Sequence, residues 1–393
     1  MNQANEPSWD VAREIASSAF KNLAPEVVSL DHAIGRVLGA PALSLCDLPA
    51  YETSAMDGWV LAAGGGPWEI VGEIVAGTVP AKKLLAGQAM KIATGGIIPS
   101  GGHSVLRWEH AREEAGFIIG QTSPGQDIRP AAQESKQGEL LISAGTLLTP
   151  AMVGLLAACG HDSVLVGRKP RAAILLLGDE LMFSGVPENG RVRDSLGIQI
   201  PAMLNDLGVE VISVAYLEDE LESVINGFKK VINSVDILIT TGGTADGPRD
   251  HIHAAIQSRN WKLLVDRVKV RPGHPMLLAV GKNDAGHSIP ILGLPGNPQS
   301  AVVALLTLGL PLINSLLGKD IEPLQNVTTM EELVAPVGFN RLVAGRLEGS
   351  GFYPAQYLGS AMLRGLAHST GFGVIEGGST RSGASIRWLP LPQ

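Results

Sequence analysis

The sequence predicts an α/β protein of several domains: a mostly parallel α/β domain, a small β-rich inserted domain and a C-terminal β-domain. Between residues 170 and 318, short apolar runs alternate with helical patterns, which is typical of a parallel sheet covered by helices on both faces. Residues 50–132 and 320–393 carry short apolar runs separated by glycine turns, a pattern that indicates β-structure. The chain has 393 residues, which at ~150 residues per domain corresponds to about two to four domains.

The elements of the α/β domain follow from the spacing of apolar residues, because apolar runs predict strands and helical spacing predicts helices. The predicted strands span residues 172–177, 209–216, 236–240 and 289–293. The predicted helices are one that starts after the N-cap pair Asp194-Ser195, one over 220–234, and one in the apolar run 300–317. Prolines and asparagines interrupt the region around this last run, so we expect a buried helix and no membrane span.

The flanking regions predict shorter elements. Helices are expected over residues 9–20, 31–38 and 149–159. Strands are expected at 68–74, 90–93, 104–108, 116–120, 163–166, 341–347, 373–376 and 385–389. In the inserted domain, Asp57 and Thr94 lie in glycine-containing turns, where turn formation is their simplest role.

Composition and charge exclude several classes of protein. Hydrophobic residues make up 45% of the chain and charged residues 17%, which is too apolar for a disordered protein. The net charge of −8 argues against binding to nucleic acid or to an anionic membrane surface. Cys46 and Cys159 are too few for a disulfide framework or a thiolate metal site. Because no basic segment followed by an apolar run opens the sequence, no signal peptide is expected and we place the protein in the cytoplasm.

Four loops rich in glycine or polar residues belong to the α/β domain: residues 178–180, 241–250, 271–275 and 293–298. Ligands of parallel sheets bind beyond the carboxyl ends of the strands, so these loops are candidate binding segments. Glycine lets backbone N–H groups approach a phosphate closely, and a helix N-terminus adds partial positive charge. The loops therefore predict an anion-binding edge.

Charged residues near these loops favour a phosphorylated substrate bridged by a hard cation such as Mg²⁺. The acids are Glu180, Asp246 and Asp250, and the arginines are Arg249, Arg267 and Arg271. Taken singly, each loop can also be an ordinary turn, and the alternating Arg267 and Arg271 can form a solvated strand face. No loop matches the Walker A or dinucleotide-binding pattern, which disfavours ordinary nucleotide hydrolysis and hydride transfer.

A set of motifs runs through nearly the whole chain. They are SAMDG at residues 54–58, IATGGIIPSGGHSVLRWE at 92–109, LLGDEL at 176–181 followed by Asp194-Ser195, ITTGGTADGPRD at 239–250, RPGHP at 271–275, GLPGNPQSA at 293–301 and AQYLGSAMLRGL at 355–366. In this order they resemble the molybdopterin molybdenumtransferase family, of the MoeA and gephyrin E-domain type. The MDG and GLPGNP blocks are the more specific of them.

The resemblance implies a fold and a reaction. The fold is an elongated homodimer whose chain has four subdomains: an N-terminal linker and dimerisation domain over 1–47 and 133–168, the β-rich insertion over 48–132, the α/β molybdopterin-binding domain over 169–318, and a C-terminal β-barrel-like domain over 319–393. The reaction inserts molybdate into the dithiolene of adenylylated molybdopterin, with release of AMP, and depends on Mg²⁺. A recipient molybdoenzyme or an upstream adenylyltransferase are further candidate partners, without nucleic acid or membrane.

The resemblance also implies site residues. Catalytic roles fall on Asp57, Glu134, Glu180, Asp219 and Asp250, with Glu180 and Asp250 as metal ligands. Substrate binding falls on Thr94, Arg129, Gly242, Gly243, Arg267, Arg271, Pro295, Gly296, Pro298 and Ser360. The sites between residues 57 and 134 would face the sheet domain of the partner subunit, so that dimerisation completes the pocket.

The chain departs from the family pattern around the expected anion site. Gln133-Glu134 stands where the family has the Asp of a GED motif, Arg267 and Arg271 replace lysines, and His274 replaces the second lysine of KPGKP. Arginine keeps the charge but changes the donor geometry, and histidine loses its charge near neutral pH. Two alternatives therefore stay open: a non-catalytic paralogue that binds molybdopterin and delivers cofactor to a molybdoenzyme, and another enzyme on the same sheet, such as a nucleotide pyrophosphatase or deamidase. The MDG, TGG and GSAML blocks argue against the latter.

Overall fold

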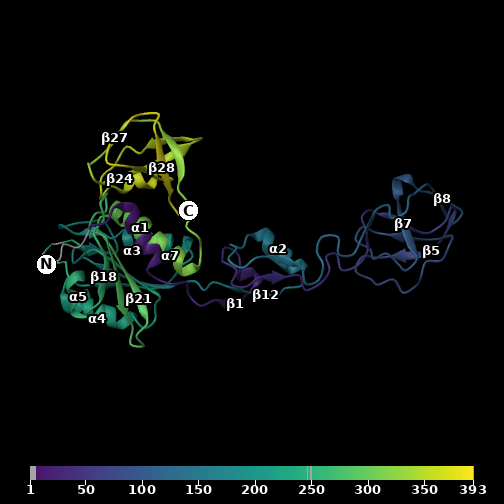
Figure 1. The fold of residues 1–393 in the computed structure, drawn as a ribbon, viewed down its shortest axis with the longest axis horizontal. Coiled ribbons are helices and arrows are strands. Elements are labelled where there is room, and N and C mark those ends of the chain that lie inside the picture. Colours follow the sequence, from purple (N-terminus) through teal and green to yellow (C-terminus); the bar gives the residue numbers. More distant parts are fainter. Residues whose placement is uncertain (1–5, 246, 248–249, 393) are drawn as a thin grey trace. The chain divides into compact units, whose positions relative to one another are not determined.

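The computed structural model describes residues 6–245, 247 and 250–392, and these residues form two compact units (Figure 1). The larger unit contains residues up to Pro25 and from Gly167 onward, and the smaller unit spans Glu26–Val166. Within the expected N-terminal segment, residues 1–47, the described residues 6–25 therefore lie with the α/β domain.

A six-stranded sheet forms the centre of the larger unit, in the order β16-β13-β17-β21-β20-β18. The first four strands are parallel, and β20 and β18 extend the sheet as antiparallel pairings. The mostly parallel sheet expected from the sequence is thus confirmed. The strands are β13 (Arg171–Leu177), β16 (Glu210–Leu217), β17 (Ile237–Thr241), β18 (Lys262–Asp266), β20 (Leu277–Lys282) and β21 (Ser288–Leu294).

Helices cover both faces of this sheet (Figure 1). Alternate residues of β13 enter two separate cores: Ile174 and Leu176 pack with the helices on one face, and Leu175 and Leu177 pack with those on the other. After the exposed Arg171 the strand is apolar, because both of its faces are buried. The first face is covered by α1 (Trp9–Ser18), α3 (Leu196–Asp206), α6 (Pro298–Ala304) and α7 (Leu310–Leu317), and the second by α4 (Leu221–Val231) and α5 (Ile252–Ser258).

The apolar run at the end of the sheet domain is a core helix. It continues from α6 through a π-helical turn, η3 (Leu305–Gly309), into α7. The segment Pro298–Leu317 has 20 residues, and its most apolar 18-residue stretch has a mean hydropathy of 2.0, so it is long and apolar enough to cross a membrane. However, 83% of that stretch is buried inside the protein. The expectation of a buried helix is confirmed.

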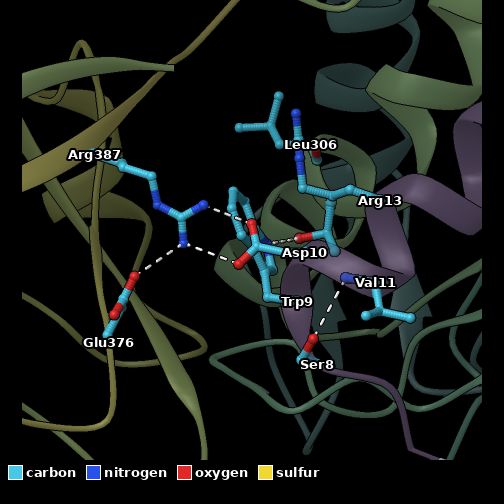
Figure 2. A network of polar contacts seen from close by, with 9 residues as sticks. Ser8, Trp9, Asp10, Val11, Arg13, Leu306, Glu376 and Arg387 are labelled. Atoms are coloured by element: carbon cyan, nitrogen blue, oxygen red, sulfur yellow. Dashed lines mark hydrogen bonds and ion pairs between the residues drawn. The ribbon is translucent and has the colours of Figure 1, made fainter. Parts of the chain in front are cut away.

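Helix α1 ties this core helix to the C-terminal domain (Figure 2). The indole Nε1 of the buried Trp9 donates a 2.9 Å hydrogen bond to Thr307, and Arg13 donates to the Leu306 carbonyl at 2.7 Å. Both acceptors lie in the π-helical turn. On the other side, Arg387 of the C-terminal domain forms an ion pair with Asp10 at 2.6 Å.

The C-terminal domain is a closed ring of five strands. The sheet runs β19-β24-β25-β22-β28-β26, and an additional pairing of β24 with β26 closes it. Strand β19 (Val270–Arg271) comes from the sheet domain and joins at β24. The other elements are β22 (Gln325–Thr329), β23 (Leu333–Ala335), β24 (Asn340–Glu348), β25 (Gly351–Pro354), α8 (Leu363–Ala367), β26 (Gly371–Ile375), β27 (Gly378–Thr380) and β28 (Ser385–Pro390).

The smaller unit contains the expected β-rich insertion. Its six-stranded sheet runs β7-β4-β6-β5-β9-β8. These strands are β4 (Gly58–Ala62), β5 (Trp68–Ile74), β6 (Gln88–Ile92), β7 (Gly102–Arg107), β8 (Arg112–Glu114) and β9 (Phe117–Ile119). The rest of the unit consists of β1 (Glu26–Ser29), β2 (Ala42–Leu43), β3 (Thr53–Ser54), β10 (Ile128–Arg129), β11 (Leu140–Ile142), α2 (Pro150–Ala158) and β12 (Ser163–Val166).

One predicted helix of the smaller unit is wrong. Residues 31–38 contain only the end of a short 3₁₀ turn, Leu30–His32. Gly35 then adopts a left-handed φ of +75° and donates its N–H to the Leu148 carbonyl at 2.8 Å. Leu38 donates to the Thr146 carbonyl at 2.9 Å. The chain here forms hydrogen bonds with a distant segment in place of a helix, which an apolar spacing cannot reveal.

Candidate functional site

A cavity of about 600 Å³ lies at the carboxyl edge of the large sheet. Strands β13, β17 and β21 are parallel, so the loops that follow them meet at this edge. The loop between β18 and β20 reaches the same edge, because Asp266 at the end of β18 pairs with Leu277. The lining residues are Leu177, Glu180, Leu181, Val192–Leu196, Thr241–Gly243, Gly296–Pro298, Ala361 and Leu363.

Two glycine loops form adjacent parts of the cavity wall. Gly242 and Gly243 both adopt left-handed φ angles, +79° and +65°, which glycine tolerates without strain. The Gly242 N–H donates to the Leu294 carbonyl at 2.9 Å. A Cβ atom on Gly296 would lie 3.7 Å from the Gly242 Cα. The loop after β17 is therefore hydrogen-bonded to the end of β21, and the wall carries little side-chain bulk here.

Glu180 lines the cavity from the loop that follows β13. A Cβ atom on Gly178 would lie 3.0 Å from the Glu180 Oε1, so the carboxylate folds back over a position where only glycine leaves room. The carbonyl of Glu180 accepts hydrogen bonds from Arg191 Nε at 3.1 Å and from the Val192 N–H at 2.9 Å. These bonds join Glu180 to the short pairing of β14 (Leu181–Met182) with β15 (Val192–Arg193).

Asp219 and Asp250 lie at the same edge but do not line the cavity. Asp219 is held by reciprocal hydrogen bonds with Asp179: each backbone N–H donates to the other carboxylate, at 3.2 and 3.1 Å. His251 Nε2 lies 3.0 Å from the Asp219 carbonyl. The Asp250 carboxylate accepts a hydrogen bond from the Gly247 N–H. The sequence also marked Asp246 and Arg249, which lie outside the described residues.

The start of α3 forms another part of the wall. Asp194 is buried, and its carboxylate accepts hydrogen bonds from the N–H groups of Leu196 and Gly197 at 3.0 and 3.1 Å. This confirms the predicted N-cap, with Asp194 as the capping side chain. Tyr216 donates its hydroxyl to the same carboxylate at 3.2 Å. Burial, followed by the charge of Asp194, raises the pKa of Tyr216.

Arg193 also lines the cavity, next to Asp194, and it is not among the site residues expected from the sequence. Its Nη1 atom is buried without a hydrogen-bond partner. The one signal available from the sequence is a basic residue directly before an N-cap. That signal is weak, because the pairing state of an arginine depends on distant parts of the fold.

The remaining expected substrate-binding residues of the larger unit do not line the cavity. Ser360 places its carbonyl at the start of α6, where it accepts from the Gln299 and Ser300 N–H groups at 3.0 and 3.3 Å. Arg271 stacks its guanidinium 5.0 Å from the Phe339 ring centroid. Arg267 has a left-handed φ of +68° and donates its backbone N–H to the Met276 carbonyl at 2.9 Å. Pro295 is the residue directly before the lining residue Gly296.

The expected residues of the smaller unit form a second group. The Asp57 carboxylate accepts a 2.6 Å hydrogen bond from the Thr94 N–H, and this bond holds the pKa of Asp57 below its ordinary value. Arg129 lies opposite Thr53 in the pairing of β10 with β3. Glu134 donates its N–H to the Leu48 carbonyl at 2.9 Å. The structure thus brings Asp57 and Thr94 into direct contact.

An ion pair supports this second group. Arg107 donates two hydrogen bonds to the Asp127 carboxylate, at 2.8 and 2.7 Å, and they hold the pKa of Asp127 below its ordinary value. The Asp127 carbonyl in turn accepts from the Ala55 N–H at 2.8 Å. The pair therefore fixes the turn that carries Asp57.

The donor set can be tested against the Mg²⁺ ion that the resemblance implies. Among residues 6–245, 247 and 250–392, no three His, Cys, Asp or Glu side chains come together as a metal site. Mg²⁺ is usually held by one or two carboxylates together with substrate phosphates and water. Glu180 at the cavity wall fits such a site, in which the substrate supplies the other ligands.

Two protein-family models match the chain. The MoeA N-terminal region (domain I and II) matches residues 7–160, which include Asp57, Thr94 and Arg129. The probable molybdopterin binding domain matches residues 173–315, which include the Glu180 loop and both glycine loops. The two matches follow the same order as the motifs.

Relatives match over nearly their full length. The molybdopterin molybdenumtransferase of Nostoc sp. (strain PCC 7120) is 33% identical over 390 residues, covering 93% of this chain and 89% of the relative. The molybdopterin molybdenumtransferase of Staphylococcus epidermidis is 28% identical, covering 90% and 87%. Two crystal structures of the molybdopterin biosynthesis MoeA protein of Pyrococcus horikoshii have TM-scores of 0.81 and 0.78, each over 98% of this chain and 99% of that chain, at 24% and 22% identity. They show that the fold is shared.

Proposed function

The chain belongs to the molybdopterin molybdenumtransferase family, transferases of molybdenum cofactor biosynthesis, and on this premise we propose that it inserts molybdate into adenylylated molybdopterin with release of AMP. The observation that carries the proposal is the cavity of about 600 Å³, whose wall combines the Glu180 carboxylate with Gly242, Gly243 and Gly296. Such a wall suits a ligand with several phosphate oxygens and room for a pterin.

The chain's own groups contribute by positioning and electrostatics. Glycine loops let the substrate phosphates approach the backbone closely. Glu180 and Asp250 orient the substrate, and Arg267 and Arg271 favour the molybdate oxyanion. No activated nucleophile is needed, because the arrangement stabilises charge where it develops and holds the two reactants together. Asp57, Thr94, Arg129 and Glu134 are proposed to serve the same reaction.

A divalent cation fits this proposal. Glu180 and Asp250 would hold Mg²⁺ together with substrate phosphate oxygens. When bound, the ion neutralises phosphate charge and strengthens binding of the adenylylated substrate. We also propose that the protein works as a homodimer in the cytoplasm, with a molybdoenzyme or an adenylyltransferase as further partner.

A turnover assay tests the proposal. Purified protein is mixed with adenylylated molybdopterin, Mg²⁺ and molybdate, and AMP release is followed together with the formation of active cofactor. We expect molybdate-dependent AMP release, and Glu180→Gln should lower its rate by about a hundredfold or more, because a positioned charge is lost from the site. Removal of divalent cations with a chelator should have a similar effect.

Glu188→Gln is the matched control, because Glu188 is an exposed acid of the same segment and does not line the cavity. We expect it to keep the wild-type rate. Tight binding of the adenylylated compound without AMP release would contradict the transferase proposal and leave a carrier role. Equal rates in all three proteins would contradict the role of Glu180.

A further inference from the structure

We propose that Arg193 binds an oxyanion of the substrates in the cavity, as a substrate-binding residue additional to those that the family motifs indicate. The proposal deepens the proposed function and rests on it for the identity of the substrates. The chemistry that Arg193 recognises is a phosphate or molybdate oxygen, which a guanidinium can bind through two parallel N–H donors.

The first observation is the pairing state of Arg193. Its Nη1 atom is buried and meets no acceptor, and among the described residues no hydrogen bond or ion pair of the guanidinium occurs. A buried donor without a partner is costly, and such groups usually have a ligand or a water as partner. Because Arg193 lines the cavity, an acceptor can arrive from that side.

The second observation concerns the adjacent carboxylate, Asp194. The Asp194 carboxylate accepts hydrogen bonds from two N–H groups at the start of α3 and from the Tyr216 hydroxyl. Its oxygens therefore serve as a helix cap, and it accepts no hydrogen bond from Arg193 among the described residues. The neighbouring Arg191 differs, since it donates to the carbonyls of Glu180 and Leu181. Arg191 has a structural role, whereas the charge of Arg193 is left for a ligand.

The third observation is the wall that Arg193 shares. Gly242, Gly243, Gly296 and Asn297 line the same cavity. At the start of α6, the N–H groups of Gln299 and Ser300 are taken by the Ser360 carbonyl. These two N–H groups at the N-terminus of α6 are therefore not free to bind an anion. An anion in the cavity then needs a positive group elsewhere in the wall. Arg193 supplies it.

The test compares wild type with two variants. Arg193→Gln removes the positive charge, and Arg193→Lys keeps the charge but loses the two parallel N–H donors of the guanidinium. Arg381→Gln is the matched control, an exposed arginine of the C-terminal domain. Three quantities are measured: the dissociation constant of adenylylated molybdopterin without molybdate, the KM for molybdate in AMP release, and the dissociation constant of inorganic pyrophosphate alone. Thermal unfolding checks that each variant is folded.

We expect Arg193→Gln to weaken the binding of one of the two oxyanions, phosphate or molybdate, by about tenfold to a hundredfold. This is the effect of losing one charge-assisted hydrogen bond. Weaker binding of adenylylated molybdopterin, with an unchanged KM for molybdate, assigns Arg193 to the phosphates. A raised KM for molybdate alone assigns it to molybdate. Arg193→Lys should recover part of the loss in the same quantity, because it keeps the positive charge.

The inference is overturned if both Arg193 variants are folded and all three quantities stay within about twofold of wild type. Failure of the proposed function looks different, because wild type would then bind no adenylylated molybdopterin and release no AMP. In that case the affinity for pyrophosphate still tests the role of Arg193. Weaker pyrophosphate binding in the Arg193 variants alone supports the oxyanion site. The same affinity in the Arg193 variants and in Arg381→Gln overturns it.

Discussion

Gly242 occupies a position in the cavity wall that requires glycine. Its φ is +79°, and a Cβ atom there would lie 3.0 Å from the Leu177 carbonyl oxygen. The sequence predicted a glycine loop after this strand on chemical grounds, and both the loop and its place at the sheet edge are found in the structure. The hydrogen bond from Gly242 to Leu294 was not predictable, because it depends on which strands become neighbours.

Gly242→Ala should be more disruptive than the matched change Gly286→Ala. Both positions have left-handed φ angles, +79° and +81°, so each alanine costs about 1–2 kcal/mol in backbone strain. Gly286 has open space around it, whereas alanine at Gly242 must also displace the Leu177 carbonyl. Hydrogen exchange of β17 and β20 measures the stability, and the affinity for adenylylated molybdopterin measures the site. Equal losses in both variants, with unchanged affinity, would contradict this role.

For the other residues of the site, prediction from the sequence succeeded only where the pattern lies in neighbouring residues. The Asp194-Ser195 cap was predictable, because a helix start depends on neighbouring residues. Arg193 was missed, because nothing local tells a paired arginine from an unpaired one. The contact of Asp57 with Thr94 joins residues far apart in the sequence, and only the family resemblance suggested that both belong to a site.

Among the helices and strands, α1 makes the contacts that are most useful to test, through Trp9 and Asp10 (Figure 2). Trp9 is fully buried and donates to Thr307 in the π-helical turn. Trp9→Phe should destabilise the larger unit by about 1 kcal/mol or more, because it removes a buried hydrogen bond. Asp10→Asn breaks the more exposed ion pair with Arg387, which should cost less than about 1 kcal/mol.

The measurement is hydrogen exchange of α7 and β28 in each variant and in Trp9→Phe/Thr307→Val. The double variant should lose little more than Trp9→Phe alone, because both changes remove the same hydrogen bond. Fully additive losses would show that Trp9 and Thr307 act independently. A larger effect of Asp10→Asn than of Trp9→Phe would also contradict the ranking.

Elements with a strong repeating pattern were predicted well. Strand β5 and strand β12 have the expected ends, and the four parallel strands of the large sheet differ from expectation by one residue at a boundary. Strands β18 and β20, which extend this sheet, were not predicted. The helix expected over residues 31–38 failed, because Gly35 turns the chain toward residues 146–148. The π-helical turn inside the apolar helix has no sequence signal, since it depends on packing against α1.

At the scale of the molecule, the two units have separate cores. Leu156 is buried in a core of the smaller unit, and Leu176 is buried in a core of the larger one. Leu156→Ala should destabilise the smaller unit by about 2–5 kcal/mol, and Leu176→Ala should do the same to the larger unit. Each change should leave hydrogen exchange in the other unit unchanged. Loss of protection in both units of either variant would show that they unfold together.

The fold class was predictable from the whole chain, because alternating strands and helices differ clearly from runs of short strands. The division into units was harder. Residues 6–25 lie with the sheet domain, since Trp9 and Ala12 join its core, and no linker composition marks that change.

We propose that molybdenum insertion takes place at the carboxyl edge of the large sheet. The most direct measurement is a crystal structure of the Glu180→Gln protein with adenylylated molybdopterin. We expect the phosphates beside Gly242, Gly296 and Arg193, with the pterin in the same cavity. Ordered substrate at any other place, with this cavity filled only by water, would contradict the claim.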